Sequence, residues 1–439
     1  MCNGPIFKKM LLFALPLMCS GILQLLFNAA DIIVVGKFAG DNALAAVGSN
    51  TALISLLTNL FIGLSIGANV LTAKFYGAKK HKELSRAVHT SMLLSVYCGV
   101  VLTIVGIVGA KQILELMQTP EEVLVLAEEY LRIYFLGMTA MMIYNFGSAI
   151  LRASGDTKRP LYYLIAAGII NVFLNLILVI VFKLGVVGVG VATAVSQCVS
   201  AFLVVRCLMK EQGALRLELK KLRIYKCDLI DIVRIGLPAG FQGLVFSLSN
   251  VVIQSAVNSF GAVVVAGNSA ASNIEGFVYF AMNAFYQAAI SFTSQNVGAG
   301  KYERVNRILL TAQVCVIVVG LCLGNAAVIF GKGLLGIYSS SPEVIDAGMN
   351  RLGIISRTYA LCGMMDVMVG SLRGLGYSIT PMIVSLVGAC GLRLLWVATV
   401  FPIEQFHVIS TVYISYPVTW TITLCAHILC YIKFRRRLT

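Results

Sequence analysis

The chain has 439 residues, 59% of them hydrophobic and only 12% charged, with a mean hydropathy of +0.88 and a formal net charge of +15. Because soluble domains carry about 25% charged residues, this composition excludes a soluble enzyme and predicts a polytopic all-α membrane protein. The positive charge does not indicate a nucleic-acid partner, because 26 of the 34 lysines and arginines fall at the chain ends and in alternate loops between apolar runs.

Long apolar runs broken by short polar connectors predict twelve transmembrane helices, each long enough for a bilayer core that needs about 20 residues. The alternating basic loops follow the positive-inside rule, so both termini are expected in the cytoplasm and the protein in the plasma or inner membrane. The predicted spans are 9–35, 46–74, 88–109, 124–150, 160–182, 186–209, 230–258, 263–295, 307–330, 347–371, 380–401 and 408–432.

The longest connector, 210–229, is also the most charged, and it divides the spans into six and six. The spacing of Leu215, Leu219 and Leu222 predicts a short amphipathic helix on the membrane surface. We therefore expect an N-terminal six-helix lobe over 1–209, a charged cytoplasmic linker over 210–229 and a C-terminal six-helix lobe over 230–439.

The two halves of the sequence repeat each other. Leu15-Pro16 recurs as Leu237-Pro238 at an offset of 222, and Leu151-Arg152 recurs as Leu372-Arg373 at an offset of 221. Six of the nine prolines fall into such pairs. Since each half has an even number of spans, the repeat predicts two six-helix bundles related by a pseudo-two-fold axis along the membrane normal, with a central cleft. This architecture favours a transporter.

Polar side chains inside the first predicted span are candidate functional groups, because such groups are costly in hydrocarbon. Gln24, Asn28 and Asp31 share one helical face. Asp31 is expected to load and release a proton, or to bind Na⁺ if oxygen donors surround it; a structural, hydrogen-bonded acid and an acid solvated near the helix end are the alternatives. Suitable donors stand one turn apart on two later spans, at Asn171 and Asn175 and at Thr193 and Gln197.

The second half does not copy this acid, because an offset of 222 places Ile253 opposite Asp31. Its own acids are Glu275 in the eighth span and Asp366 in the tenth, and Asp366 corresponds to Asn145 of the first half. Both acids are candidates for the substrate cleft. Arg393 in the eleventh span is a candidate to neutralise either of them, which would make the pair structural.

Aromatic and sulfur side chains follow Glu275 on successive helical turns. Tyr279, Met282 and Tyr286 predict a wall suited to a cationic, partly aromatic solute, with ordinary helix packing as the alternative. The Arg152 and Arg373 segments are interpreted as cytoplasmic loops in which arginine anchors phosphates or caps helix ends. The chain has no phosphate-cradling G-x-x-x-x-G-K-[ST] motif, so we expect neither ATP nor any cofactor or metal beyond the coupling ion.

Several segments form one pattern: Leu15-Pro16, Asn28-Ala29-Ala30-Asp31, Gly77-Ala78, Leu151-Arg152-Ala153-Ser154-Gly155-Asp156-Thr157 and Leu372-Arg373-Gly374-Leu375-Gly376. Together they resemble the multidrug and toxic compound extrusion (MATE) family over essentially the whole chain. The resemblance implies twelve helices in two six-helix lobes with a V-shaped cleft, and the export of organic cations in exchange for H⁺ or Na⁺.

The resemblance also implies roles for individual residues. Asp31 matches a proposed cation-coupling acid, and Asn171 and Thr193 match its partners. Asn175 is an amide where the family often has an aspartate, which removes one charge from the site. One branch has an acid in the seventh span, where this chain offers only uncharged residues such as Asn250.

Two other function classes remain open. A lipid-linked oligosaccharide flippase of related architecture would favour a cleft with several arginines, and only Arg393 is a strong intramembrane candidate. A membrane-embedded enzyme needs a catalytic constellation, and the sequence has no H-E-x-x-H or Asp-rich metal motif. The expected partners are therefore a small organic cation and membrane lipid, without nucleic acid, and a monomer is favoured.

Overall fold

The structure, a computed structural model, describes residues 1–117 and 119–436, and these residues form helices and no β-strand. The helices of the first half are α1 (Ile6–Phe38), α2 (Asp41–Gly77), α3 (His81–Leu116), α4 (Glu121–Leu136), α5 (Met138–Ser154), α6 (Lys158–Asn175), the π-helix η1 (Leu176–Val181) and α7 (Gly185–Lys210). The connector holds the short 3₁₀ helices η2 (Gly213–Leu215) and η3 (Leu219–Lys221).

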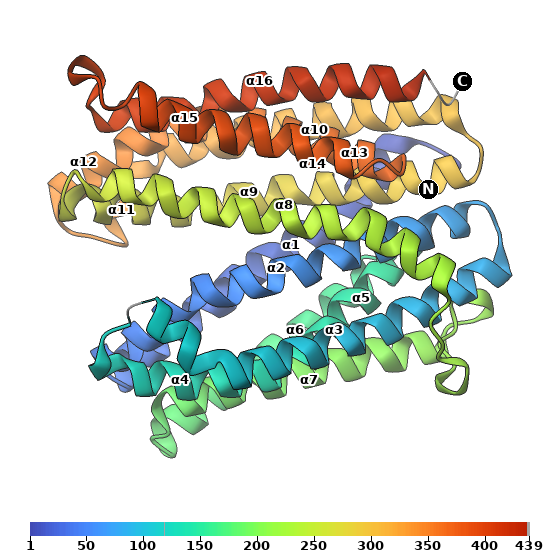
Figure 1. Cartoon of the computed structure of the whole chain (residues 1–439), viewed down its shortest axis with the longest axis horizontal. Helices are drawn as coiled ribbons and strands as arrows, with labels where there is room; N and C mark the ends of the chain where they lie inside the picture. Colours follow the sequence, from blue (N-terminus) through green and yellow to red (C-terminus); the bar gives the residue numbers. More distant parts are fainter. Residues whose placement is uncertain (118, 437–439) are drawn as a thin grey trace. The chain divides into compact units, whose positions relative to one another are not determined.

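The second half repeats the long helices of the first, with more breaks between segments (Figure 1). Its helices are α8 (Lys226–Asn258), α9 (Ala262–Gly298), α10 (Tyr302–Ile329), α11 (Gly331–Gly336), α12 (Pro342–Arg351), the π-helix η4 (Leu352–Ser356), α13 (Arg357–Gly374), α14 (Ile379–Ser385), the π-helix η5 (Leu386–Gly391), α15 (Leu392–Thr399), the 3₁₀ helix η6 (Glu404–Phe406) and α16 (Ile409–Arg435).

Each of the twelve predicted spans coincides with one helix or with consecutive helical segments, so the all-α polytopic fold is confirmed. Among the described residues, ten helical segments are long and apolar enough to cross a membrane, and the pair α4–α5, bent by 45°, is an eleventh. Helix α9 is long enough as well, but its asparagines, serines and glutamines make it more polar than the others.

The predicted amphipathic helix in the connector is wrong. The segment forms only the two 3₁₀ turns, and its backbone is otherwise mainly extended. Leu215 and Leu217 are buried and Arg216 between them is exposed, as expected where side chains of an extended segment alternate between two faces. Leu219, in the second 3₁₀ turn, is 54% exposed. The three leucines of the predicted helix therefore do not form the single apolar face that an amphipathic helix requires.

The connector is held against α3 by two side chains of that helix. The Glu218 backbone N–H donates to Nε2 of the buried His89 at 3.1 Å. The Tyr225 backbone N–H donates to the Thr90 hydroxyl at 3.2 Å. These bonds satisfy backbone donors that no regular secondary structure pairs, so the connector has a defined path on α3.

The chain packs as two compact units. The N-terminal unit is Leu23–Gly240, and the C-terminal unit combines Met1–Ile22 with Phe241–Thr439. Both boundaries fall inside a helix, α1 and α8 respectively, a few residues after Pro16 and Pro238. The opening part of each of these two helices therefore belongs to a different unit from its remainder.

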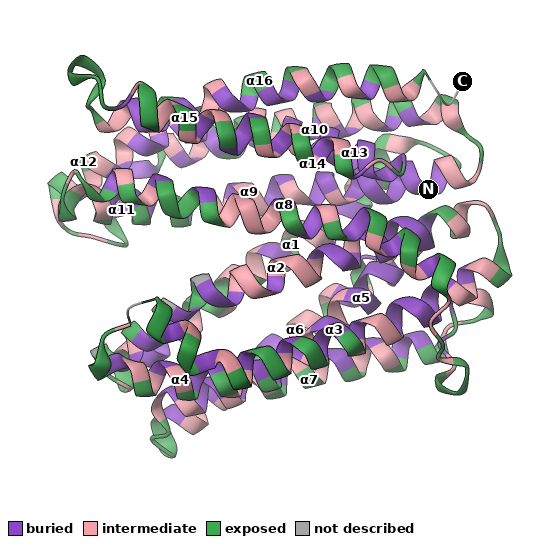
Figure 2. Ribbon diagram, in the orientation of Figure 1, coloured by how far each residue is buried: buried purple, intermediate pink, exposed green. Residues whose placement is uncertain are grey.

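Small residues let helices of the N-terminal unit approach closely. A Cβ at Gly63 would collide with the backbone of Gly240, and a Cβ at Gly106 would collide with the ring of Phe135. Glycine at such positions allows the backbone contact that drives helix packing in lipid. Figure 2 shows that the buried residues of the unit lie where its helices face one another.

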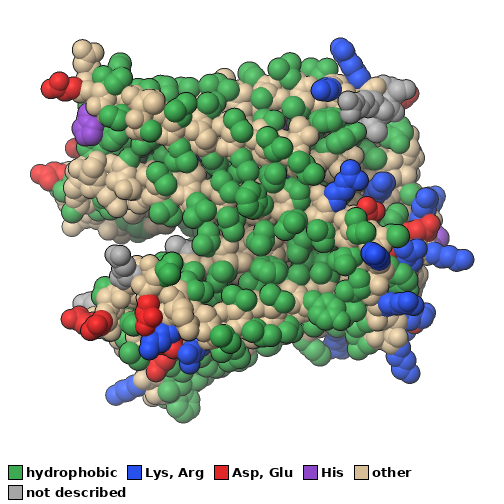
Figure 3. All heavy atoms as spheres, viewed as in Figure 1, with side chains coloured by type: hydrophobic (Ala, Val, Ile, Leu, Met, Phe, Trp, Pro, Cys, Tyr) green, Lys and Arg blue, Asp and Glu red, His purple; other side chains and the backbone are tan. Residues whose placement is uncertain are grey.

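The C-terminal unit has a core of its own, to which the start of the chain contributes. Phe13 packs edge-to-face on Phe292, with ring centroids 5.6 Å apart. Ahead of α1, the Lys301 ammonium donates to the backbone oxygen of Cys2 at 3.0 Å, and Arg304 donates to that of Gly4 at 3.0 Å. On the face shown in Figure 3, hydrophobic side chains cover the sides of each unit, as a lipid-facing surface requires.

Candidate functional site

Asp31 lies at the centre of a chain of hydrogen bonds in the N-terminal unit. Asn175 Nδ2 donates to the Asp31 carboxylate and lies 3.3 Å from the Asn171 side-chain oxygen, and Asn171 Nδ2 donates to the Thr193 hydroxyl at 3.4 Å. Asn171 and Asn175 are one turn apart on α6 and are 5% and 1% exposed. The structure therefore brings together all four residues predicted to couple the cation.

Local packing explains how α1 reaches α6. Gly168 lies one turn before Asn171, and a Cβ there would collide with the ring of Phe27, one turn before Asp31. The missing side chain lets the two helices approach and places the carboxylate beside the amides. Helix α7 follows after a tight turn in which Lys183 and Gly185 have φ of 54° and 55°, and this turn sets Thr193 next to α6.

Two tyrosines of α4 complete the site, and sequence analysis missed them. Both Tyr130 and Tyr134 lie near the Asp31 carboxylate, and Tyr134 also lies near Gln197. Their rings lie 5.8 Å apart. Tyr130 is buried and Tyr134, one turn later on α4, is half-buried. This i, i+4 pair of polar-tipped rings is the signal that was available in the sequence.

The Asp31 cluster is rich in oxygen atoms that bind hard cations. It offers a carboxylate, amide oxygens and hydroxyls, the ligand types that such cations prefer. Asn175 Oδ1 is buried and accepts no hydrogen bond within the described part of the chain. In that same part, no lysine or arginine forms an ion pair with Asp31. The donor set therefore fits either a proton on Asp31 or a small cation shared with the amides.

Three other predicted residues of the N-terminal half lie outside the bonded chain. Gln24 and Asn28 are exposed on α1. The side chain of Asn145 is half-buried and donates to the Met141 carbonyl of its own helix at 2.9 Å. Of the three polar residues on the first span, only Asp31 joins the cluster.

Glu275 of the C-terminal unit is bound by Arg351, at the end of α12. Arg351 Nη2 lies 2.7 Å from Oε2, and Nε lies 3.1 and 3.2 Å from the two carboxylate oxygens. Arg351 Nη1 donates to Asn268 Oδ1 at 2.7 Å, which also accepts from the Tyr413 hydroxyl at 3.3 Å. Glu275 and Arg351 are 3% and 7% exposed, so this is a buried and well-bonded ion pair.

The pair corrects the expected partner, because Arg393 bonds neither acid. Arg393 lies over the Tyr416 ring at 3.9 Å from its centroid and donates to the Thr419 hydroxyl at 3.3 Å. The sequence could not separate the two arginines, since both lie in or near spans. Only the packing of α9 on α12 decides which guanidinium meets Glu275.

The remaining C-terminal candidates divide between packing and polar contacts. Met282 is 2% exposed, and its sulfur lies 2.9 and 2.8 Å from where a Cβ on Gly320 or Gly363 would stand, so Met282 fills space between helices. Tyr279 lies near Asp366, which is half-buried. Asn250 is exposed on α8. The structure gathers these residues in one unit but not around a single point.

Arg373 does not lie in a loop as expected. It belongs to the last turn of α13 and is 3% exposed. Its guanidinium donates to the Tyr286 hydroxyl and, at 2.8 Å, to Gln242 Oε1. The following Gly376 has φ of 96° and makes the turn. The glycine pattern therefore predicted where the helix ends, but it did not predict that the Arg373 side chain is buried in the unit.

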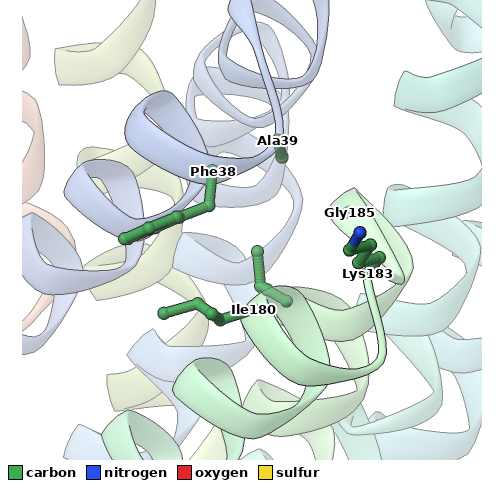
Figure 4. A pocket seen from close by; sticks show the side chains of 6 residues that line it. Phe38, Ala39, Ile180, Lys183 and Gly185 are labelled. Carbon is green, nitrogen blue, oxygen red and sulfur yellow. The ribbon is translucent and has the colours of Figure 1, made fainter.

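An open pocket of about 430 Å³ lies beyond the Asp31 cluster, at the end of α1 (Figure 4). Its wall is about equally polar and apolar, and Lys183 is its charged residue. None of the predicted site residues lines it. Its lining residues are Phe38, Ala39, Val179, Ile180, Lys183 and Gly185.

Comparison with known proteins places this arrangement in a family. The MatE family model matches residues 16–177 and 238–398, one segment in each half. The chain is 27% identical to the probable multidrug resistance protein YoeA of Bacillus subtilis, with 95% of this chain and 92% of the relative covered. It is 26% identical to the probable multidrug resistance protein NorM of Thermotoga maritima, over 88% of this chain and 84% of that one.

Solved structures share the fold. An outward-facing multidrug resistance MATE family transporter of the MOP superfamily matches with a TM-score of 0.93 at 22% identity, covering 99% of this chain and 97% of the other. A MATE crystal structure in complex with MaL6 matches with a TM-score of 0.91 at 22% identity, covering 100% and 97%. Since the family model covers most of both halves, the chain belongs to the MATE family.

Proposed function

We propose that this protein is a multidrug efflux transporter that exports organic cations in exchange for H⁺ or Na⁺. The observation that carries the proposal is the Asp31 cluster: a carboxylate without an arginine or lysine partner among the described residues, surrounded by amide and hydroxyl groups within a membrane-spanning bundle. The names of the relatives, multidrug resistance proteins, support the substrate class.

The proposed cycle is alternating access between two lobes, 1–209 and 230–439, joined by the linker 210–229, with both termini in the cytoplasm. Entry of the coupling ion from outside loads Asp31, and the loaded state disfavours bound organic cation because both are positively charged. One charge crossing 100 mV supplies about 2.3 kcal/mol, which corresponds to roughly fiftyfold accumulation. This energy is sufficient for export without ATP.

The alternative of a lipid-linked oligosaccharide flippase has less support. It requires arginines free to hold a pyrophosphate, whereas Arg351, Arg373 and Arg393 are buried and bonded to side chains of their own unit. We also propose transport and not catalysis, with an organic cation and membrane lipid as the partners of a monomer.

The test is efflux of a fluorescent organic cation from proteoliposomes under separately imposed proton and sodium gradients. We expect one gradient to drive efflux, and Asp31→Asn to abolish that response while the yield of monodisperse protein is unchanged. Glu115→Gln removes an exposed carboxylate at the end of α3 and is the matched control. Full gradient-driven efflux by Asp31→Asn would refute the role of Asp31.

A further inference from the structure

Both oxygens of the Glu275 carboxylate are bonded by the guanidinium of Arg351. Oε1 accepts from Arg351 Nε, and Oε2 accepts from Nε and Nη2. The rings of Tyr413 and Tyr416 lie 5.6 and 5.9 Å from the guanidinium carbon. The carboxylate, an amide oxygen and two aromatic rings thus surround a cation, as in a cation-binding site. The bound cation here is the guanidinium of Arg351, which is part of the chain.

The internal repeat relates Arg351 to the Asp31 cluster of the other half. At an offset of 221, the buried positions Ala127 and Tyr130 of α4 correspond to the buried positions Gly348 and Arg351 of α12. Tyr130 is one of the two tyrosines beside Asp31. The C-terminal half therefore has a guanidinium at the position where the N-terminal half has a hydroxyl next to its acid.

A second arginine follows the same relationship. The π-helical turn η5 accommodates one extra residue, which raises the offset after it to 222 and aligns the buried Arg393 with the buried Asn171. At that offset Asp31 corresponds to Ile253. The counterpart of the Asp31 cluster thus has lost its acid and gained two permanent positive charges.

We propose that Arg351 is a tethered counter-cation that keeps Glu275 ionised and closed to H⁺ and Na⁺, so that Glu275 takes no part in ion exchange. Arginine does not lose its proton in proteins, unlike a transported ion, which must leave. Arg393 contacts the same Tyr416 ring as Arg351 and adds a second permanent positive charge, which opposes the entry of a further cation; Asp366 is the other acid of this region. This inference deepens the proposed function. It rests on that function only in taking ion exchange as the activity from which Glu275 is excluded.

The direct test does not depend on transport. Infrared spectra of the reconstituted protein are recorded from mildly acidic to mildly alkaline pH, and the protonated-carboxyl band is compared between wild type and the neutral pair replacement Glu275→Gln with Arg351→Met. We expect an unchanged band, because Glu275 is never protonated in the wild type. If the intensity of this band in the double variant is lower by that of one carboxyl group, the proposal is overturned.

Two further variants calibrate this measurement. Arg351→Met alone is expected to gain one protonated carboxyl, because the stranded Glu275 then takes up a proton. If this variant does not fold, the double variant, which buries no unpaired charge, still decides. Asp31→Asn is measured in the same way and tests the proposed function separately, since its result leaves the expectation for Glu275 unchanged.

The transport readout is the number of cations exchanged per exported molecule, obtained from reversal potentials in proteoliposomes. The double variant is expected to keep the wild-type number. A decrease by one cation in folded protein would show that Glu275 is a carrier and would reject the tethered cation, whatever the result for Asp31→Asn.

Discussion

The Asn175 side chain donates a hydrogen bond to the Asp31 carboxylate while its own Oδ1 is buried and accepts none within the described residues. One amide thus orients the acid and offers an oxygen ligand at the same time. This division of roles explains how the site is organised with a single negative charge. Replacing the Asn175 amide by a carboxylate is therefore the change that would alter the preference between H⁺ and Na⁺.

Asn175→Asp is expected to raise the affinity for Na⁺ by at least about tenfold, which corresponds to about 1.4 kcal/mol. Two neighbouring carboxylates repel each other until a cation lies between them. The measurement is equilibrium binding of radioactive sodium to purified protein at alkaline pH. Asn145→Asp, whose amide bonds only to its own helix, is the control, and equal affinities for all three proteins would contradict the prediction.

Tyr134→Phe is expected to weaken cation binding severalfold and to lower stability by up to about 1 kcal/mol, the net value of one hydrogen bond. The substitution removes a hydroxyl that lies near Asp31 and Gln197. Thermal unfolding in detergent and gradient-driven efflux are measured together. Tyr162→Phe changes a tyrosine that is 58% exposed and should leave both quantities as in wild type; a Tyr134→Phe protein that behaves likewise would remove this tyrosine from the site.

His89→Ala is expected to release the connector from α3. The substitution leaves the Glu218 N–H without its acceptor, at a cost of about 1 kcal/mol for one lost hydrogen bond. Limited proteolysis should then cut residues 211–225 faster than in wild type. His81→Ala, at the exposed start of α3, is the matched control. Equal cleavage rates for the two variants would show that His89 does not hold the connector on α3.

Gly106→Ala is expected to destabilise the N-terminal unit by about 1–3 kcal/mol, as overpacking of a filled core does. The added methyl group meets the ring of Phe135, which is fully buried. Combining it with Phe135→Leu should restore part of the lost thermal stability. Gly48→Ala, where nothing lies within 4 Å of the new Cβ, is expected to be neutral; if it cost as much, helix packing at Gly106 would not be the cause.

The spans were predictable because hydrocarbon thickness sets the length of an apolar run, and the four polar residues of the cation cluster were predictable because helical spacing places Asn171 beside Asn175. The break at Gly137 and the π-helical turns were not, since they depend on neighbouring helices. At Gly137, for example, a Cβ would stand 2.5 Å from Gln197 Oε1 on α7.

The choice between Arg351 and Arg393 as the partner of Glu275 shows the limit most clearly. Both are arginines in apolar surroundings, and their spacing from Glu275 along the chain carries no information about which side chain arrives there. The directions of α9, α12 and α15 decide it. In the same way, the leucine spacing of the connector fits a helix, but the connector's backbone groups bond instead to His89 and Thr90 of α3.

The unit boundaries inside α1 and α8 have a consequence for cutting the molecule. A fragment that ends at the linker lacks Ile232, which packs on Leu71 and Ala87, and a fragment that begins after it lacks Met10 and Phe13 of the other core. Each fragment would carry its neighbour's opening helical turns and miss its own.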